Sequence, residues 1–409
     1  MSTALPLSQA LPSQTRSVAS LATLYIARML GLFMVLPVLS LAGDEYIGSN
    51  VFLLGVALGV YGLTQACLQI PFGILSDRFG RKPLIVIGLV LFGLGSILAA
   101  SAQTVEGLIA GRALQGAGAI AGVIMAMVGD LTTGKDRSKA MASIGASIGV
   151  AFALSLVLGP VVTSVGGIRW VFWLTLGLSI AGILIVLFAI PAVPQVSVKR
   201  SLSLRGIKIV ASDINLWRLN VGIFVLHAVL MALFVALPLL LTSVDIPQSK
   251  HAWVYLSVMG IAFLLMVPLM IIGERQGKVR CIFLSILILA VFALLGLSLV
   301  VAGTDTDVLL VLLSTLVFFI AFNYLEATLP SLMSKTVTAS QRGAGSGLFS
   351  TCQFLGAAVG GMMGGWLFSQ FGLSVMLLAC SGLLLCWWLF ALAMVIPQSA
   401  EIKTENVVV

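Results

Sequence analysis

Charged side chains are scarce in this 409-residue sequence: Asp, Glu, Lys and Arg make up only 9% of it, whereas 60% of its residues are apolar. Soluble domains carry about 25% charged residues, so the chain lacks the charge to cover the surface of a soluble protein. Its 42 glycines and its apolar content exclude a coiled coil and a disordered chain. The apolar runs are continuous rather than alternating, which disfavours a transmembrane β-barrel. A helical membrane protein remains.

Motifs for metals and nucleotides are also missing. The chain has five cysteines and two histidines, and no cysteine forms a metal-spaced pair with a histidine. We interpret the cysteines as small, buried apolar residues. No glycine-rich phosphate-binding loop is present, so ATP is not expected to be the direct energy source. We therefore expect no metal and no cofactor.

Twelve apolar stretches follow one another from residue 18 to residue 396, each long enough to cross about 30 Å of hydrocarbon as a helix. The first is too long for a removable signal peptide and lacks a small-residue cleavage site. The sequence thus predicts an all-α integral membrane protein. The predicted spans are 18–41, 51–75, 83–101, 105–128, 140–163, 170–191, 216–241, 252–272, 281–301, 308–333, 343–368 and 373–396.

The basic residues predict the orientation. If both termini are cytoplasmic, 18 of the 22 Lys and Arg residues fall in cytoplasmic tails and loops, and only Arg169 and Lys250 lie on the opposite side, as the positive-inside rule requires. Positive charge spread over short loops also argues against nucleic-acid binding. The predicted organisation is a cytoplasmic tail (1–17), a six-helix bundle (18–191), a basic cytoplasmic linker (192–215), a second six-helix bundle (216–396) and a cytoplasmic tail (397–409).

The two halves of the chain echo each other. Residues 77–81, Asp-Arg-Phe-Gly-Arg, and residues 274–278, Glu-Arg-Gln-Gly-Lys, share one pattern at an offset of 197 residues. Leu158-Gly159 matches Leu355-Gly356 at the same offset. This indicates a duplicated six-helix unit. Repeated halves are common in secondary transporters, whose substrate sites lie near the middle of the membrane.

The stretch Gly73-Ile74-Leu75-Ser76-Asp77-Arg78-Phe79-Gly80-Arg81-Lys82 follows the second span. It resembles the G-x-L-x-D-R-x-G-R-K signature of the major facilitator superfamily, which implies 12 helices arranged as two pseudo-symmetric six-helix bundles. The resemblance also implies a conformational latch that holds the outward-facing state. The latch residues would be Gly73, Asp77, Arg78, Gly80, Arg81, Lys82 and Asp130.

Each latch residue has a physical role in this interpretation. Asp77 would meet the amides and dipole at the start of span eleven, near residue 343. Arg81 would pair with Asp130 at the end of span four, and Gly80 would permit the tight turn. The alternative is a plain basic loop that serves only the positive-inside rule.

Further stretches resemble the same family. Residues 108–118 are similar to its span-four motif, which carries an intramembrane arginine, here Arg112. Residues 155–160 partly match its span-five antiporter motif and end in Gly159-Pro160, where we expect a helix bend. Residues 28–37 and 321–327 resemble a YajR-like group of proton-driven exporters. Some members carry a soluble domain after the last span, which we expect this chain to lack.

Ionisable residues inside a span are costly and indicate function by default. The predicted spans hold Arg28, Arg112, His227 and Glu326, on the spans that line the central cavity in this family. Glu326 is the only carboxylate among them. A surrounding of low dielectric disfavours its charged form, which suits a proton carrier. The alternatives for Glu326 are a structural ion pair with Arg28 and hydrogen bonding to Asn323.

The other three ionisable residues also have two interpretations. Arg28 could release Glu326 from an ion pair during transport, or it could bind an anionic substrate group. Arg112 could tune proton transfer or anchor the cavity wall, or it could merely bind nearby carbonyls. His227 could titrate near neutral pH or act as an interhelical hydrogen-bond donor.

Polar and aromatic residues on the cavity-lining spans are candidates for substrate binding, although each could equally satisfy a neighbouring helix. They are Tyr61, Gln65, Gln69, Asn220, Phe224, Met231, Phe234, Phe319, Asn323 and Gln353.

Three functions follow from these features. The first is proton-coupled export, by antiport and alternating access, of small amphipathic or hydrophobic compounds across the bacterial inner membrane. The second is proton-coupled uptake of a specific metabolite, and the third is a membrane sensor or scaffold without transport. None is an enzyme. The expected partners are a small-molecule substrate, protons and the lipid bilayer, and we expect a monomer.

Overall fold

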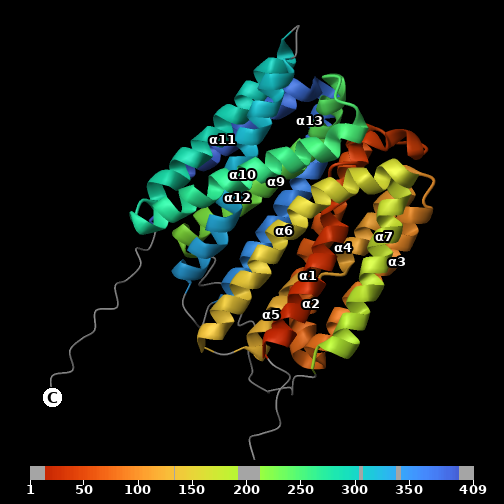
Figure 1. Ribbon diagram of the computed structural model, residues 1–409, viewed down its shortest axis with the longest axis vertical. Helices are drawn as coiled ribbons and strands as arrows, with labels where there is room; N and C mark the ends of the chain where they lie inside the picture. Colours follow the sequence, from red (N-terminus) through yellow and green to blue (C-terminus); the bar gives the residue numbers. More distant parts are fainter. Residues whose placement is uncertain (1–13, 133, 192–211, 304–306, 338–341, 396–409) are drawn as a thin grey trace, which may run out of the picture. The chain divides into compact units, whose positions relative to one another are not determined.

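The computed structural model describes residues 14–132, 134–191, 212–303, 307–337 and 342–395 (Figure 1). The predicted linker, apart from its last residues, and most of both tails lie outside these ranges. The helices are α1 (Gln14–Phe33), α2 (Val51–Phe79), α3 (Arg81–Ser101), α4 (Val105–Ala117), α5 (Ala121–Leu131), α6 (Gly134–Gly166), α7 (Ile168–Leu184), α9 (Ile214–Ser243), α10 (Gln248–Arg275), α11 (Val279–Ala302), α12 (Val308–Thr336) and α13 (Arg342–Ala391). Short helical turns lie at Leu39–Leu41, Gly43–Glu45 and Ile185–Ala189.

Ten helical segments in the described part of the chain are long and apolar enough to cross a membrane. One of them contains most of α13, which joins two predicted spans across Gly372, a residue with a non-helical φ of 84°. The remaining predicted span corresponds to α1, whose apolar character is lowered by Arg16 and Arg28. Every predicted span therefore has a helix in the structure.

Two predicted spans differ from the observed helices. The span predicted over 18–41 ends as an α-helix at Phe33. Pro37 explains this, because its ring would clash with the carbonyl four residues earlier in a continuous helix. The span predicted over 105–128 is interrupted between α4 and α5, where Gly118 leaves the helical conformation with ψ of 57°. A Cβ atom on Gly118 would lie 2.2 Å from the carbonyl oxygen of Gly88, so this glycine also permits α3 to approach closely.

The helices form two compact units, described here one at a time. Unit 1 contains Met1–Ser49 and Thr64–Ser201, and unit 2 contains Asn50–Leu63 and Leu202–Val409. In unit 1, α3 packs against α4 and α7, while α1 packs against α6 and α7. In unit 2, α9 packs along α13, and α11 packs against α12 and α13.

Matching details in the two units support the predicted duplication. Gly80 and Gly277 hold the same place in the repeated loop motif and have positive φ angles of 94° and 65°. The hydroxyl of Ser179 donates to the carbonyl of Leu89 at 2.6 Å, and 202 residues later Ser381 donates to Val291 at 2.9 Å. The turn and the helix pairing thus recur in both halves.

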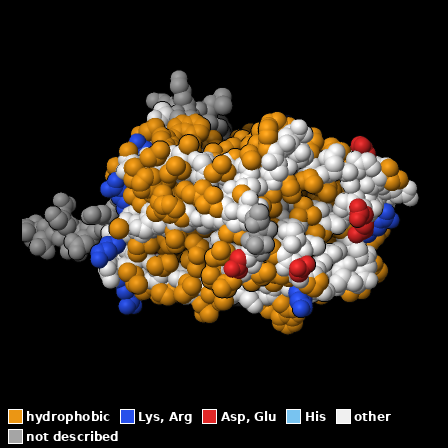
Figure 2. Space-filling model, turned by 90° about the horizontal axis from the view of Figure 1, so that it is seen from above, with side chains coloured by type: hydrophobic (Ala, Val, Ile, Leu, Met, Phe, Trp, Pro, Cys, Tyr) orange, Lys and Arg blue, Asp and Glu red, His pale blue; other side chains and the backbone are white. Residues whose placement is uncertain are grey.

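The exposed surface suits a lipid environment. Hydrophobic side chains cover most of the face shown in Figure 2, and several large ones are strongly exposed, such as Phe188 and Leu264. The cysteines take part in this surface, which corrects the prediction that they are buried. Among them only Cys380 is buried, whereas Cys67, Cys281 and Cys386 are exposed. Small apolar residues fit the outer face of a membrane helix as well as its interior.

Glycines set the spacing between α9 and α13 in unit 2. A Cβ atom on Gly356 would lie 2.1 Å from the carbonyl oxygen of Phe224, and one on Gly360 would lie 2.0 Å from that of Ala228. The two backbones therefore touch, as helices with small residues at every fourth position can do in a membrane. His227 lies on α9 between these two contact points.

We expect Gly360→Ala to destabilise the protein by about 1–3 kcal/mol, because the added methyl group must push α13 away from α9. Thermal unfolding of the purified protein in detergent measures this. Gly347→Ala is the matched control, since a Cβ on Gly347 of the same helix meets nothing within 4 Å. Equal melting temperatures for the two variants would contradict the expectation.

Candidate functional site

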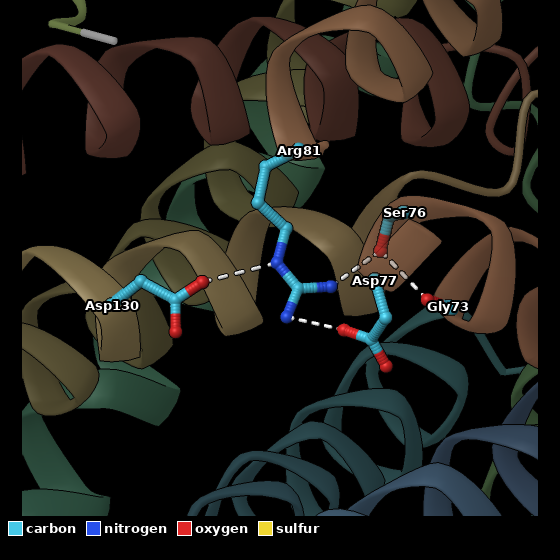
Figure 3. A network of polar contacts seen from close by, with 5 residues as sticks. All are labelled: Gly73, Ser76, Asp77, Arg81 and Asp130. Atoms are coloured by element: carbon cyan, nitrogen blue, oxygen red, sulfur yellow. Dashed lines mark hydrogen bonds and ion pairs between the residues drawn. The ribbon is translucent and has the colours of Figure 1, made fainter. Parts of the chain in front are cut away.

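The loop between α2 and α3 holds a network centred on Arg81 (Figure 3). Arg81 Nη2 lies 2.5 Å from Asp77 Oδ1, and its Nε donates to Asp130 Oδ2 at 3.1 Å. The arginine thereby joins the end of α2, the start of α3 and the end of α5. Sequence reasoning missed Ser76, whose hydroxyl accepts from Arg81 and donates to the carbonyl of Gly73. The position of Ser76, one helical turn before Gly80, was the feature of the sequence that could have indicated its role in this network.

The backbone and the flanking cations complete this loop. Gly80 precedes α3 with a φ of 94°, a region that residues with a Cβ rarely adopt. Lys82 donates from Nζ to the carbonyl of Ile190 at 2.8 Å, and the guanidinium of Arg78 lies 5.3 Å from the centre of the Phe79 ring. The proposed partner of Asp77, the helix that begins at residue 342, belongs to unit 2, so that contact stays a prediction.

Arg28 of α1 is buried in unit 1. Its Nη2 donates to Gln65 Oε1 at 3.3 Å and to the carbonyl of Gly118 at 3.1 Å. Its guanidinium carbon lies 3.9 Å from the centre of the Phe92 ring, a cation–π geometry. The interruption between α4 and α5 places the Gly118 carbonyl at this point. The predicted pairing of Arg28 with Glu326 involves unit 2 and stays a prediction.

Arg112 is fully buried between α4 and α3. Its Nη1 donates to Gln115 Oε1 at 2.8 Å, and Gln115 Nε2 donates to Ser96 Oγ on α3 at 2.8 Å. Sequence reasoning did not single out Gln115 or Ser96. This hydrogen-bonded series of side chains favours the anchoring interpretation of Arg112, because it fixes α4 to α3.

Unit 2 brings His227, Glu326 and Gln353 together from α9, α12 and α13. Gln353 Nε2 lies 2.9 Å from His227 Nε2 and 3.3 Å from Glu326 Oε1. His227 Nε2 lies 3.8 Å from Glu326 Oε2. We refer to these three residues as the unit 2 polar cluster. It joins two of the four predicted proton-coupling candidates through Gln353, which sequence reasoning considered only for substrate binding.

The backbone fixes the hydrogen on the His227 ring. Nδ1 lies 3.2 Å from the carbonyl oxygen of Ile223, one turn earlier in α9. A carbonyl only accepts, so Nδ1 carries the hydrogen and donates it. In the neutral ring Nε2 is then an acceptor. The Phe322 ring packs edge-on against the imidazole, with centroids 6.2 Å apart.

Several of the remaining cavity candidates lie on α9 and α12 of unit 2. Phe234 and Phe319 pack together, with ring centroids 6.1 Å apart, and the backbone carbonyl of Phe224 on α9 lies closely against Gly356 of α13. These are packing contacts. Asn220 and Asn323 are better candidates for substrate binding. Both are buried, and the Asn220 Oδ1 and Asn323 Nδ2 atoms have no hydrogen-bond partner within the described structure.

The other candidates lie on α2 and α9. Gln65 holds Arg28, Gln69 lies beside Gly122, and Tyr61 and Met231 are buried. Pro160 lies within α6, which continues to Gly166. A Cβ on Gly159 would lie 2.4 Å from the carbonyl oxygen of Met34, so Gly159 permits a close approach of the chain that follows α1.

Comparison with known proteins decides the family. A model described as Major Facilitator Superfamily matches residues 21–360 and 233–407. The chain belongs to the Major Facilitator Superfamily. It is 42% identical to the inner membrane transport protein YajR of Escherichia coli (strain K12), over 94% of this chain and 85% of YajR. It is 28% identical to the multidrug resistance protein MdtH of Aeromonas hydrophila, over 82% of both proteins.

Two solved structures share the fold of this chain. A bacterial homolog of the human lysosomal transporter Spinster matches with a TM-score of 0.71 at 14% identity, over 94% of this chain and 98% of that protein. The human organic anion transporter MFSD10 matches with a TM-score of 0.69 at 17% identity, over 93% and 100%. The family match and the similarity to YajR show that the chain is a membrane transporter of the major facilitator type rather than an enzyme.

Proposed function

We propose that this transporter is a proton-coupled exporter of small amphipathic or hydrophobic compounds in the bacterial inner membrane. It would work by antiport and alternating access, as expected for a transporter built from two repeated units. The relative named as an inner membrane transport protein supports the location, and the relatives named for multidrug resistance support the direction.

The observation that carries the proposal is the unit 2 polar cluster. Glu326 is the carboxylate and His227 the imidazole that lie inside the predicted spans of unit 2, and ionisable side chains in such places indicate function by default. Their side chains lie 3.8 Å apart and share the amide of Gln353. No other described contact in unit 2 joins a carboxylate to a histidine. The pair therefore offers a place for coupling protons.

The surroundings of the cluster favour an apolar cargo. Phe322 covers the imidazole of His227, and Phe318 and Phe319 lie against Phe322 with ring centroids 6.3 and 6.4 Å away. Binding sites for amphipathic molecules are lined mainly by hydrophobic and aromatic side chains with a few polar groups. A cluster with few charges and many rings fits that description.

A second candidate is proton-coupled uptake of an anionic metabolite. The buried guanidinium of Arg28 favours it, because Phe92 and Gln65 hold that charge in a fixed orientation. A fixed arginine suits the recognition of carboxylate or phosphate groups.

The phenotype of a deletion strain separates the candidates. If the protein exports amphipathic compounds, the deletion should sensitise cells to lipophilic cationic dyes such as ethidium, and the gene on a plasmid should restore growth. Everted membrane vesicles containing the protein should release protons when ethidium is added. A growth defect on a single nutrient, without dye sensitivity, would favour uptake. Absence of flux for every compound tested in liposomes would favour the sensor or scaffold.

A further inference from the structure

Two arginines on the predicted cytoplasmic side of unit 2 contact the end of α13. The guanidinium carbon of Arg218, on α9, lies 5.5 Å from the centre of the Phe390 ring. Arg280, on α11, donates from Nη2 to the carbonyl of Leu392 at 2.6 Å. Phe390 and Leu392 are two residues apart, so two separate helices bring a positive charge to the same part of α13. We refer to Arg218 and Arg280 as the arginine pair.

A buried tryptophan joins the two helices that carry the arginine pair. Trp387 of α13 packs edge-on against Phe283 of α11, with ring centroids 6.0 Å apart, and a Cβ atom on Gly222 of α9 would lie 2.7 Å from the same indole. Arg218 precedes Gly222 by four residues, and α9 begins on the cytoplasmic side. Arg280 precedes Phe283 by three residues, and α11 begins on that side too. Each arginine therefore lies about one helical turn from this ring, toward the cytoplasm.

The arginine pair has no carboxylate partner among the described residues. Helices α9, α11 and α13 contain no Asp or Glu. The acid just before α9, Asp213, accepts from the backbone amides of Asn215 and Leu216. Each guanidinium has five N–H groups, and each uses one of them in a described hydrogen bond, to a neutral oxygen. The pair thus keeps donors and positive charge for an anion.

Arginines on this side of a membrane protein often extend freely into water. Arg218 is held against the protein instead. Its Nη1 donates to Asn215 Oδ1 at 2.9 Å, and Phe390 lies beside its guanidinium. Asn215 Oδ1 also accepts from the backbone amide of Val395 at 3.5 Å, which ties the start of α9 to the chain after α13. A guanidinium held in this way presents its planar fork in a fixed direction, which suits a phosphate group.

The surroundings of the arginine pair distinguish a lipid from a free anion. Exposed hydrophobic side chains lie on the same two ends, at Ile214, Trp217, Leu389, Leu392 and Val395. Acyl chains would cover these side chains, whereas a free phosphate ion would leave them in contact with water. Tryptophan is also typical of the level of the membrane at which headgroups lie.

We propose that the arginine pair binds the phosphate of an anionic phospholipid in the cytoplasmic leaflet. Basic groups between helices on this side of a membrane suit anionic headgroups. The lipid would complete the charge balance of α9, α11 and α13 and would hold their cytoplasmic ends at the membrane surface. This site is separate from the unit 2 polar cluster and does not depend on which compound is transported.

Native mass spectrometry of the full chain in detergent counts the lipids that stay bound. The probe is dioleoyl phosphatidylglycerol, and dioleoyl phosphatidylcholine is the comparison, because it has the same acyl chains and a phosphate but no net charge. We expect one phosphatidylglycerol to remain bound at concentrations at which phosphatidylcholine is lost. Arg218→Gln and Arg280→Gln should each weaken this binding by about 10-fold or more, since each removes charge-assisted hydrogen bonds.

Arg275→Gln is the matched control. It removes one positive charge from the same side, at the exposed end of α10, where Arg275 has no described contact with α13. It should weaken binding by less than about 3-fold, because salt at about 0.15 M screens a surface charge that makes no direct contact. Equal weakening by all three variants would overturn the proposal, since only total charge would then matter.

Two other results would overturn the proposal. One is equal retention of phosphatidylcholine and phosphatidylglycerol by the unaltered protein. The other is an equal rise in melting temperature with inorganic phosphate and with phosphatidylglycerol, which would indicate a site for a free anion. If Arg218→Gln does not fold, Arg280→Gln still tests the pair, because Arg280 is exposed. Failure of the proposed export would appear separately, in the vesicle assay.

Discussion

Glu326→Gln should abolish gradient-driven transport while leaving the protein folded. The glutamine has the same shape as a protonated glutamate, and it can still accept a hydrogen bond from Gln353 through its own amide oxygen. It cannot release a proton, however. Exchange of substrate across the membrane can then persist, but a proton gradient can no longer drive accumulation. The reason is that coupling needs a group that alternates between charged and neutral forms inside the membrane.

The size of the effect follows from the gradient. Each pH unit corresponds to about 1.4 kcal/mol per proton, so about 2 units support roughly 100-fold accumulation for every coupled proton. Purified protein in liposomes with an imposed pH gradient, and ethidium as the transported dye, should show this accumulation. Glu326→Gln should reduce it to none. Glu106→Gln is the matched control, because this acid is exposed at the start of α4.

Two results would change the interpretation of Glu326. Full accumulation by Glu326→Gln would rule out its role as a proton carrier. A misfolded variant would favour a structural role, because loss of one partner of a buried ion pair costs about 3–5 kcal/mol. Thermal unfolding of the same preparation separates a folded, uncoupled transporter from an unstable one.

The sequence predicts the membrane fold well because the bilayer imposes a simple rule. Helices must be about 20 apolar residues long, and each of the twelve predicted stretches has a helix in the structure. The turn at Gly80 could also be predicted from the sequence, since a glycine followed by Arg81 and Lys82 between two spans indicates a tight turn. The positive φ of Gly277 at the same place in the second half follows from the repeat.

The interruption at Gly118 could not be predicted from periodicity. The sequence around it is apolar and rich in glycine, with Gly116, Gly118 and Gly122 close together, so tertiary structure decides where the helix breaks. Gly88 approaches from α3, and Arg28 donates to the Gly118 carbonyl from α1. Neither residue is near Gly118 in sequence. Predictions based on local pattern therefore fail where a distant side chain needs a backbone carbonyl.

The partners of the ionisable residues were the hardest feature to predict from the sequence. Matching opposite charges led to Arg28 and Glu326 as a pair, yet the partners observed within each unit are mostly neutral. Gln65 and a carbonyl hold Arg28, and Gln353 holds Glu326. Gln353 lies 126 residues from His227 and 27 from Glu326. Neutral amides carry no charge signal, so only the packing of α9, α12 and α13 identifies them.

Asp77→Asn should reduce transport while leaving stability nearly unchanged. Asp77 and Arg81 are partly exposed, with 36% and 17% of their side-chain surfaces accessible, and such pairs contribute about 0–1 kcal/mol to stability. Arg81 also retains Asp130 in the variant. The expected loss concerns conformational balance, because the proposed latch depends on a negative charge that faces a helix N-terminus.

The expected shift can be bounded. A carboxylate at a helix N-terminus contributes about 0.3–2 kcal/mol, so its loss should move the balance between outward-facing and inward-facing states by roughly 2-fold to 30-fold. Cross-linking accessibility of engineered cysteine pairs on the two sides of the membrane measures that balance, alongside ethidium transport in liposomes. Asp44→Asn, at an exposed acid before α2, is the control. If Asp77→Asn keeps both the balance and the transport rate of the unaltered protein, the loop serves only as a basic connection, and the Arg81 network holds α2, α3 and α5 together without acting as a latch.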